Sequence, residues 1–430
     1  MVTVKGAPDT APPSVAYRRW LVVVLLSLAT VVAYMDRVNL SVALIDVHFK
    51  TFFGLTNTDR GLANSAFFWS YAVLQIPAGW IVDRYGSKYP IAFAFGVWSL
   101  LTAVTALTTG FQALFAIRML LGVAEAVIHP ASLCWIRFNF PEKQRGLAIG
   151  IFMSGSKFGP AIGAVVAAWL IESYGWQLMF VILGAGALIW LVPWLIFADR
   201  DRRPDKTAAA TTAVEPSVPM AQLFASPVLW GTVIGTFCYM YFVYFCLTWM
   251  PAYFNEARHL SLASSSLFTT FSFAGMAVVS IFGGWAADRL IALGLPAVTV
   301  RKTFTIAGFL LATTVLIGAH ASSLNTALLF SVLSLSGLGL ATANYWALTQ
   351  SLIPSGSIGR IVGIQNCAAS LAGIVAPIFT GWLVDTTGKF DAPIEAVVVV
   401  IVIGIAAYLV LVREKYAPVK AGIKGNPDAV

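Results

Sequence analysis

Long apolar stretches recur along almost the whole of this 430-residue chain and constrain its fold more than any other feature. Each is close to the roughly 20 residues that a helix needs to cross a hydrocarbon core of about 30 Å. We count twelve, at 20–46, 61–82, 89–109, 111–136, 146–171, 176–197, 225–254, 262–287, 303–320, 324–353, 361–385 and 393–412. In lipid the backbone must satisfy its own hydrogen bonds, and the alternation typical of a barrel is absent. We therefore expect an all-α integral membrane protein with twelve transmembrane helices.

The basic residues predict the orientation of these helices. If the N-terminus is cytoplasmic, only four of the 27 Lys and Arg residues fall on the opposite side and three lie inside spans; the remaining twenty are cytoplasmic. Such a bias places both termini in the cytoplasm. It also accounts for the net charge of +8 without a nucleic-acid partner. Short loops and a short N-terminus favour a bacterial inner (plasma) membrane, and we expect a monomer.

One polar segment divides the spans into two groups of six. We predict an N-terminal bundle over 1–198, a cytoplasmic linker over 199–220 and a C-terminal bundle over 221–430. The string GWxxDR follows the second span as Gly79–Arg84 and the eighth as Gly284–Arg289, with its aspartates 205 residues apart. This repetition indicates a duplicated unit. Weaker echoes, AWLIE at 168–172 and GWLVD at 381–385, end the fifth and eleventh spans, where an ordinary helix end explains them equally well.

Five ionisable residues lie inside otherwise apolar spans of the first half: Asp36, Arg37, Arg118, Glu125 and Lys157. A charge at bilayer depth costs at least ~2.5–3.5 kcal/mol, so such residues generally face a cavity and mark a substrate or ion path. Three cations with two acids suit an anion together with a proton.

Helical geometry relates four of these residues. Arg118 and Glu125 are seven positions apart and share a helix face, about 10 Å apart along the axis. Asp36 and Arg37 diverge by about 100°, so one of them can address the fourth span while the other faces a central cavity. Desolvation favours the protonated form of Glu125 and a nearby guanidinium favours the ionised form. That competition predicts a proton-coupling acid; a permanent structural ion pair is the alternative.

The chain resembles the major facilitator superfamily through its twelve spans, their 6+6 division and the loop GWIVDRYGSK at 79–88. Within it, three strings resemble the anion:cation symporter group, which includes carriers of sugar acids, dicarboxylates, aromatic acids, sialic acid and glutamate. They are YMDRVNLS at 34–41, RMLLGVAEAVIHPA at 118–131 and WMPAY at 249–253. The resemblance implies the major facilitator fold, with two pseudo-symmetric six-helix bundles working by alternating access.

The resemblance also implies roles for individual residues. Asp36 and Glu125 would carry the coupled proton, Arg37 would bind the substrate carboxylate, and Arg118 would be an ion-pair partner of the acids. A planar guanidinium suits that carboxylate because it donates two parallel bonds. Residues matching cavity or substrate positions of the group are Tyr34, Tyr71 and Ser156; residues of the repeated loops with an ion-pair or gating role are Asp83, Arg84, Asp288 and Arg289.

Several other polar residues have two interpretations each. Lys157 replaces the uncharged residue usual in the group; it would bind a second acidic or polar group of the substrate, or pair with Glu125 or Asp36. His129 would titrate near neutral pH or pack as a neutral ring. In the second half, substrate-binding candidates that could equally join helices by hydrogen bonds are Asn344, Trp346, Asn366 and Ser370.

The sequence argues against several other functions. It contains no phosphate-binding GxxxxGK[ST] loop, no HExxH and no GxSxG, and its four cysteines lack metal-site spacing. We therefore expect no enzyme and no cofactor. The function we expect is proton-coupled uptake of a small organic carboxylate, such as a sugar acid, dicarboxylate or aromatic acid. Exchange or efflux of such an anion is the alternative, suggested by GSKFGPAIG at 155–163, which resembles a fifth-span motif of antiporters.

Overall fold

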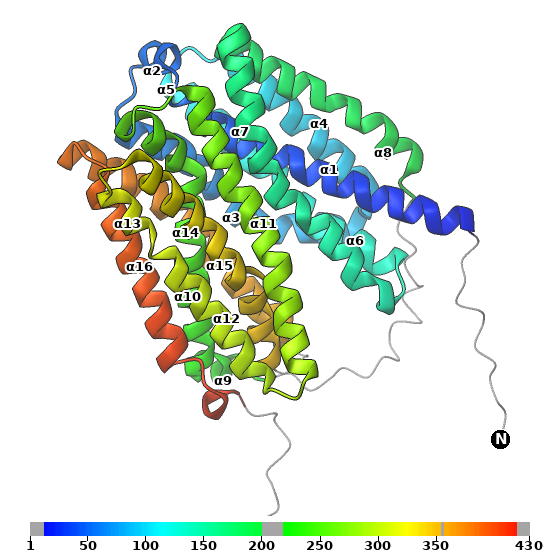
Figure 1. Cartoon of the computed structure of the whole chain (residues 1–430). Helices are drawn as coiled ribbons and strands as arrows, with labels where there is room; N and C mark the ends of the chain where they lie inside the picture. The colour runs from blue at the N-terminus through cyan, green and yellow to red at the C-terminus, as the bar shows by residue number, and fades with distance from the viewer. Residues whose placement is uncertain (1–12, 200–217, 354–356, 419–430) are drawn as a thin grey trace, which may run out of the picture.

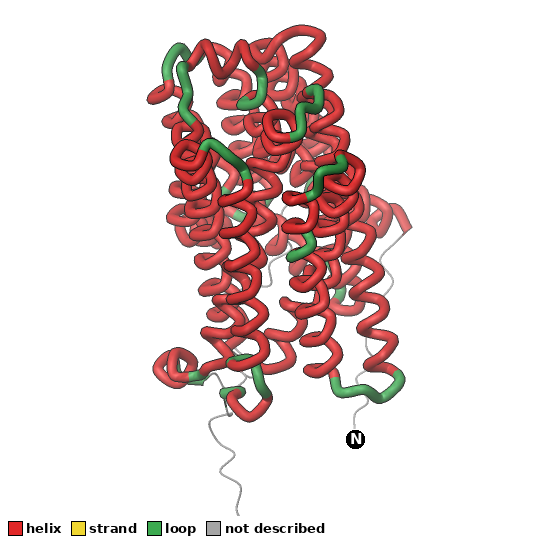
Figure 2. Tube along the Cα trace, turned by 60° about the vertical axis from the view of Figure 1, so that its left-hand side comes forward, coloured by secondary structure: helices red, strands yellow, loops and turns green. Residues whose placement is uncertain are grey.

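The computed structural model describes residues 13–199, 218–353 and 357–418, which are almost entirely helical (Figures 1 and 2). The first half contains α1 (Pro13–Ala43), α2 (Val47–Phe53), α3 (Asn57–Tyr85), α4 (Lys88–Val104), α5 (Phe111–Glu125), α6 (Ile128–Asn139), α7 (Glu142–Ala187) and α8 (Leu191–Phe197). The second half contains α9 (Met220–Ala225), α10 (Pro227–Ala252), α11 (Leu262–Ala292), α12 (Ala297–Ala312), α13 (Val315–His320), α14 (Leu324–Leu352), α15 (Ile358–Thr387) and α16 (Asp391–Val410). A π-helical turn, η4 (Tyr253–Ala257), follows α10. The described residues contain no β-strand.

The helices are consistent with the predicted twelve spans. Within the described residues, ten continuous helical stretches are long and apolar enough to cross a membrane, and α3, bent by 52° before Pro77, makes an eleventh. One of the ten, Gln144–Phe197, has 54 residues, more than twice the length of a single crossing. It turns at Gly175, whose φ of 83° is not helical, so the stretch contains two spans. The predicted linker lies outside the described residues except for Asp199 and 218–220.

Prolines explain where two of the spans bend. The ring of Pro130 has no N–H to donate to the carbonyl of Ala126, four residues earlier, and the fourth span is interrupted there, between α5 and α6. The break falls directly after Glu125. Pro77 bends α3 for the same reason.

Glycines bring α7 against α1. A Cβ added at Gly155 would overlap the carbonyl oxygen of Ser27, one at Gly159 would lie 2.5 Å from Cβ of Tyr34, and one at Gly163 would meet Val38 and Met35. The three glycines are spaced four residues apart and therefore form one face of α7. This face fixes the turn of α1 that carries Tyr34, Asp36 and Arg37.

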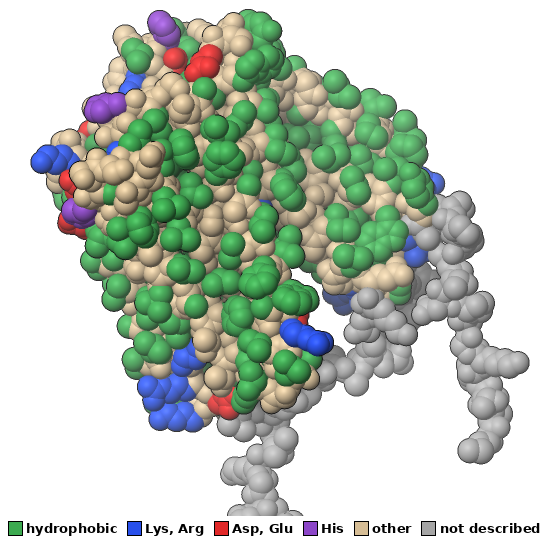
Figure 3. Space-filling view, in the orientation of Figure 1, with side chains coloured by type: hydrophobic (Ala, Val, Ile, Leu, Met, Phe, Trp, Pro, Cys, Tyr) green, Lys and Arg blue, Asp and Glu red, His purple; other side chains and the backbone are tan. Residues whose placement is uncertain are grey.

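In the part of the chain that the structure describes, the halves meet most extensively where α3 packs on α15, α7 on α11 and α1 on α10. Figure 1 shows them together at the upper end, which carries α2 and α5, and apart at the lower end, where α1 begins and α9 lies. Figure 3 shows Lys and Arg side chains mainly at the lower end and apolar side chains over the flank. The chain is thus arranged as a membrane protein whose halves are joined at the upper end.

Two carboxylates join the halves at the upper end. Asp385 of α15 accepts hydrogen bonds from the backbone N–H groups of Asn57 and Thr58, at 3.1 and 2.7 Å, and so binds the first turn of α3. Glu172 of α7 accepts one from the N–H of Ala263, at 3.1 Å, in the first turn of α11. A negative charge is favourable there because the helix dipole is positive at its N-terminus.

These two carboxylates are the last residues of the echoed strings at 168–172 and 381–385. They hold equivalent positions in the two halves, and each binds the opposite half. These two strings therefore do more than end a helix, because the last residue of each binds the opposite half.

A third contact at the upper end is ionic. Glu256 in η4 pairs with Lys50 of α2 at 2.9 Å and with Arg60 of α3 at 3.0 Å. The guanidinium of Arg60 also lies 4.9 Å from the centre of the Trp249 ring. Since Arg60 is only 3% exposed, solvent screens its ion pair with Glu256 less than it would screen a pair on the surface.

Substitution of Gly159 tests the close packing of α7 on α1. We expect Gly159→Leu to destabilise the protein by on the order of 1–3 kcal/mol, because the new side chain must displace Tyr34 and the backbone of α1. Gly150, on the same helix, has nothing within 4 Å of an added Cβ, so Gly150→Leu is the matched control. Thermal unfolding of the purified protein in detergent measures both; equal melting temperatures would contradict the packing described.

Neutralising both carboxylates of the upper end should open it. We expect the double variant Asp385→Asn, Glu172→Gln to lengthen the distance between spin labels at Thr51 and His320, which are exposed at that end. Each charge at a helix N-terminus contributes about 0.3–1 kcal/mol. The measurement is double electron–electron resonance in a background without the native cysteines.

The control for this measurement is Asp288→Asn. Its carboxylate bonds to Arg301 at 2.9 Å within the second half, so its loss should leave the distance unchanged. If the double variant gives the same distance as the control, the carboxylates do not hold the upper end closed.

Candidate functional site

Arg37 and Glu125 form a buried ion pair between α1 and α5. Nε and Nη2 of Arg37 both donate to Oε2 of Glu125, at 3.3 and 3.1 Å. Their side chains are only 4% and 1% exposed. Because water solvates neither charged group, each charge is stabilised mainly by the other.

Aromatic rings surround the guanidinium of Arg37. Its Cζ lies 4.2 Å from the ring centre of Tyr34, 4.5 Å from that of Phe67 and 5.1 Å from that of Tyr71. The faces of these rings carry negative charge density and attract a cation. The hydroxyl of Tyr71 in turn shares a 3.4 Å hydrogen bond with Nδ1 of His129, which is half-buried. The rings hold Arg37 without neutralising it.

Asp36 and Arg118 meet beside this pair. Nδ2 of Asn39 donates to Oδ1 of Asp36 at 3.2 Å, within α1. Nη1 of Arg118 donates to the backbone carbonyl of Asp36 at 3.0 Å. Among the described residues Arg118 has no carboxylate within 4.0 Å, so the expected ion pair with the acids is absent in this conformation.

Several buried polar atoms of this cluster have no hydrogen-bond partner. They are Oε1 of Glu125, Nε of Arg118 and Oδ1 of Asn39. An unpartnered buried polar atom costs about 1–3 kcal/mol, and such atoms are rare in proteins. The cluster therefore has free capacity for a proton on Glu125 and for an acceptor beside Arg118.

The local sequence explains how these residues come together. Gly122 lets α5 approach α3 so closely that an added Cβ would overlap the carbonyl oxygen of Phe67. Ser70 of α3 donates to the carbonyl of Met119 in α5 at 2.5 Å. Glu125, one turn after Gly122, is carried by this contact to Arg37 of α1. Asp36 and Arg37 point in different directions, as adjacent helical residues must.

The residues expected on α7 take separate positions. Ser156 is buried, and its hydroxyl donates to the carbonyl of Met153 in its own helix at 2.8 Å. Lys157 is half-buried. Across the described ranges it forms no ion pair, so the predicted alternative of a bond to Glu125 or Asp36 is not realised here.

The second-half candidates lie in α14 and α15. Asn344 is fully buried, and its Nδ2 donates to the carbonyls of Leu340, at 2.8 Å, and of Gly283 in α11, at 3.3 Å. It therefore joins two helices, the second of the two interpretations. Trp346 and Asn366 are half-buried and Ser370 is buried.

The residues of the repeated loops lie far from the cluster, at the lower ends of α3 and α11. Asp288 pairs with Arg301 of α12, and Arg289 is exposed. Asp83 and Arg84 are exposed at the end of α3, where Arg84 stacks on Trp80 at 5.6 Å.

The sequence analysis did not predict Phe67 or Gln365. Phe67 stacks on Tyr71 with ring centres 5.2 Å apart and lies beneath Arg37. Tyr244 of the second half contacts Phe68 at 4.4 Å and so brings α10 to the cluster. The spacing of Phe67 four residues before Tyr71 is a signal that could have found it. Gln365, wholly buried, joins Thr236 and Thr349 through its Nε2.

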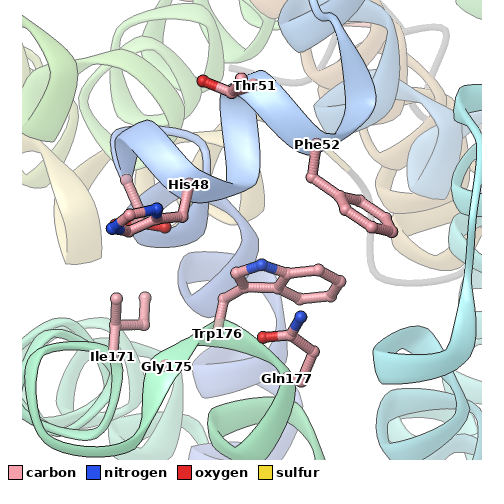
Figure 4. A pocket seen from close by; sticks show the side chains of 8 residues that line it. His48, Thr51, Phe52, Ile171, Gly175, Trp176 and Gln177 are labelled. Atoms are coloured by element: carbon pink, nitrogen blue, oxygen red, sulfur yellow. The ribbon is translucent and has the colours of Figure 1, made fainter.

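A cavity also lies outside this cluster. It has a volume of about 540 Å³ and lies at the upper end between α2 and the turn of α7 at Gly175, where Figure 4 shows His48, Trp176 and Gln177 around it. None of the predicted site residues lines it. No group of three or more His, Cys, Asp or Glu residues suited to a metal occurs in the part of the chain that the structure describes.

The sequence and the structure both resemble known transporters. The sequence profile of the Major Facilitator Superfamily matches residues 26–377. The D-galactonate transporter of Escherichia coli O6:H1 is 29% identical over 417 residues, covering 92% of this chain and 96% of its own. The probable galactarate/D-glucarate transporter of Bacillus subtilis is 30% identical, covering 92% of each chain.

Among solved structures, one of a bacterial homolog to the human lysosomal transporter Spinster, inward-facing and occupied, matches with a TM-score of 0.77 at 18% identity. The match covers 96% of the present chain and 100% of the chain in the solved structure. At that identity the likeness concerns the fold.

Removing one partner of the buried pair should have unequal effects. We expect Glu125→Gln to destabilise the protein more than Arg37→Gln does, within the roughly 3–5 kcal/mol typical of a broken buried pair. A carboxyl left alone can take up a proton, whereas a guanidinium cannot lose one. For the same reason the loss in Arg37→Gln should shrink at acidic pH. Melting temperatures in detergent at acidic and alkaline pH measure this, with exposed Arg84→Gln as the control.

The double variant Arg37→Gln, Glu125→Gln should be less destabilised than the two single changes added together. Additive and equal losses would show that the two side chains do not depend on each other.

Proposed function

The chain belongs to the major facilitator superfamily, and from that premise we propose that it takes up a small organic carboxylate together with protons. It is a multi-pass membrane carrier, not an enzyme. Superfamily membership gives the fold and the class of protein; the substrate and the coupling ion must be argued from the site.

An organic anion as substrate is supported by the relatives and by the chemistry of the site. The relatives are named for D-galactonate, galactarate and D-glucarate, and hexuronate. Here Arg37 offers a guanidinium in an aromatic cradle, and its only carboxylate partner among the described residues is Glu125. A substrate carboxylate has the same shape and charge as that of Glu125 and can take its place.

The buried Arg37–Glu125 pair is the observation that carries the proposal. One oxygen of Glu125 is bonded to Arg37 and the other has no partner. A proton on Glu125 removes the charge that holds Arg37, and the guanidinium is then available to an anion. Proton and substrate thus reinforce each other's binding, which is what symport requires.

The cycle we propose follows from this linkage. With the site open to the outside, protons neutralise Glu125 and Asp36, and Arg37 binds the substrate carboxylate. The halves then rock about the site, and the upper end closes through Asp385, Glu172 and Glu256. With the lower end open, Glu125 loses its proton, pairs with Arg37 again and displaces the substrate.

Exchange or efflux of the same anions remains the alternative. The antiporter-like string at 155–163 suggested it, but its three glycines all pack against α1. Close helix packing serves either direction of transport. The string therefore does not favour exchange over symport.

We also propose that the lower end is cytoplasmic and that the chain works as a monomer in a bacterial inner membrane. The excess of Lys and Arg at that end supports the orientation (Figure 3). The conformation described, joined at the upper end, is then inward-facing.

Proton coupling predicts a separation of two activities in Glu125→Gln. In proteoliposomes loaded with unlabelled D-galactonate, we expect counterflow of labelled substrate to persist, because the neutral amide mimics the protonated acid. Accumulation driven by a proton gradient should fall to background. Persistent counterflow also shows that the variant is folded.

Asp36→Asn provides a second test with the same pair of assays. Unchanged proton-driven accumulation in both variants would refute the coupling role of the acids. Failure of the wild-type protein to exchange any organic acid would refute the substrate class.

A further inference from the structure

Lys157 lies on the face of α7 that turns toward the second half. Gly155 and Gly159 pack on α1, and Lys157, two residues from each, points about 160° away from both. One turn later on its own face is Ala161, whose carbonyl accepts a hydrogen bond from Thr270 of α11 at 2.5 Å.

The same face opens toward the lower end. Ala164, two turns after Lys157, is wholly buried, whereas Met153, one turn before it, is 40% exposed. Lys157 therefore sits where α7 and α11 separate, at the upper limit of the space between the halves. A lysine there reaches into that space; the exposed Phe158 and Ile162 lie on another side of α7.

Lys157, like Arg118, has no carboxylate partner among the described residues. Glu125 is paired with Arg37, and Asp36 is bonded to Asn39 and lies beside Arg118. No carboxylate lies within 4.0 Å of Lys157 anywhere in ranges 13–199, 218–353 and 357–418. Three cations against two acids give the empty, ionised cluster one net positive charge.

We propose that Lys157 binds a second acidic group of the substrate, so that the preferred substrates are small dicarboxylates; this rests on the proposed function. Arg37 binds one carboxylate and Lys157 the other. With both acids protonated, a dianion returns the loaded cluster to the single positive charge of the empty one. A monoanion leaves the loaded cluster with one additional positive charge, and that charge must be carried across an apolar environment.

The spacing of the two cations suits one small molecule. Gly163 packs on Met35 and Val38, at the level of Arg37, and lies six residues beyond Lys157 on α7. Six residues of helix rise about 9 Å. The side chains of Arg37 and Lys157 are long and flexible, and they can reach the two carboxylates of a short dicarboxylic acid.

Matched pairs of acids test the proposal. The pairs are galactarate with galactonate and phthalate with benzoate; in each the second carboxylate is the decisive difference. Binding to purified wild-type protein is measured by isothermal titration calorimetry. We expect the dicarboxylate of the accepted pair to bind roughly 10–100-fold more tightly, the range of one charge-assisted contact.

Substitution then assigns the preference to Lys157. Lys157→Gln should remove the preference and leave the affinity for the monocarboxylate unchanged, and Lys157→Arg should keep it. Lys415→Gln, which removes an exposed charge at the lower end, controls for long-range electrostatics.

Three outcomes overturn the inference: a wild-type protein without preference, a Gln variant that keeps the preference, or one that loses both ligands alike. Proton-driven transport of the monocarboxylate by the Gln variant would leave the proposed function standing. If no acid of either pair, nor any other organic acid, binds to the wild-type protein, the proposed function itself fails.

Discussion

The structure depends on one electrostatic constraint: a guanidinium on α1 and a carboxylate on α5 are both shielded from water and must neutralise each other. Arg37 and Glu125 are almost fully buried, and their environment is made of aromatic rings and apolar helix faces. Separating such a pair without replacement is costly. A replacement must therefore be present whenever the pair opens, and a proton with an anion is the simplest one.

A second use of charge operates at the upper end, where the two halves meet. There the carboxylates of Asp385 and Glu172 bind helix N-termini instead of cations. Such bonds are individually weak and partly exposed, so they can break and reform. The buried Arg37–Glu125 pair is thus stronger than the bonds that Asp385 and Glu172 form at the upper end. In the proposed cycle, the buried pair selects the substrate and the carboxylates at the helix N-termini hold the upper end closed.

The sequence predicted the helices and the charged cluster, because apolar length and an ion within an apolar stretch can both be recognised along the chain. The resemblance implied Arg118 as the ion-pair partner of the acids, whereas Arg37 holds Glu125 in the structure. The close approach of α3 and α5 at Gly122, which helps to position Glu125, cannot be recognised along the chain. Phe67 was missed because only its spacing from Tyr71 distinguishes it from the many other apolar residues of its span. Asn344 had two interpretations, and only its donor geometry toward Gly283 identifies it as a link between helices.

The glycine face of α7 has a mechanical consequence. The same helix is seated on α1 through Gly155, Gly159 and Gly163, and it carries Glu172 nine residues further on, at the boundary with α11. Because no side chains separate α7 from α1 at these glycines, we expect a shift of α1, when Arg37 changes partner in the proposed cycle, to move α7 with it. In that cycle, substrate binding at Arg37 would be coupled to the contact of Glu172 with α11.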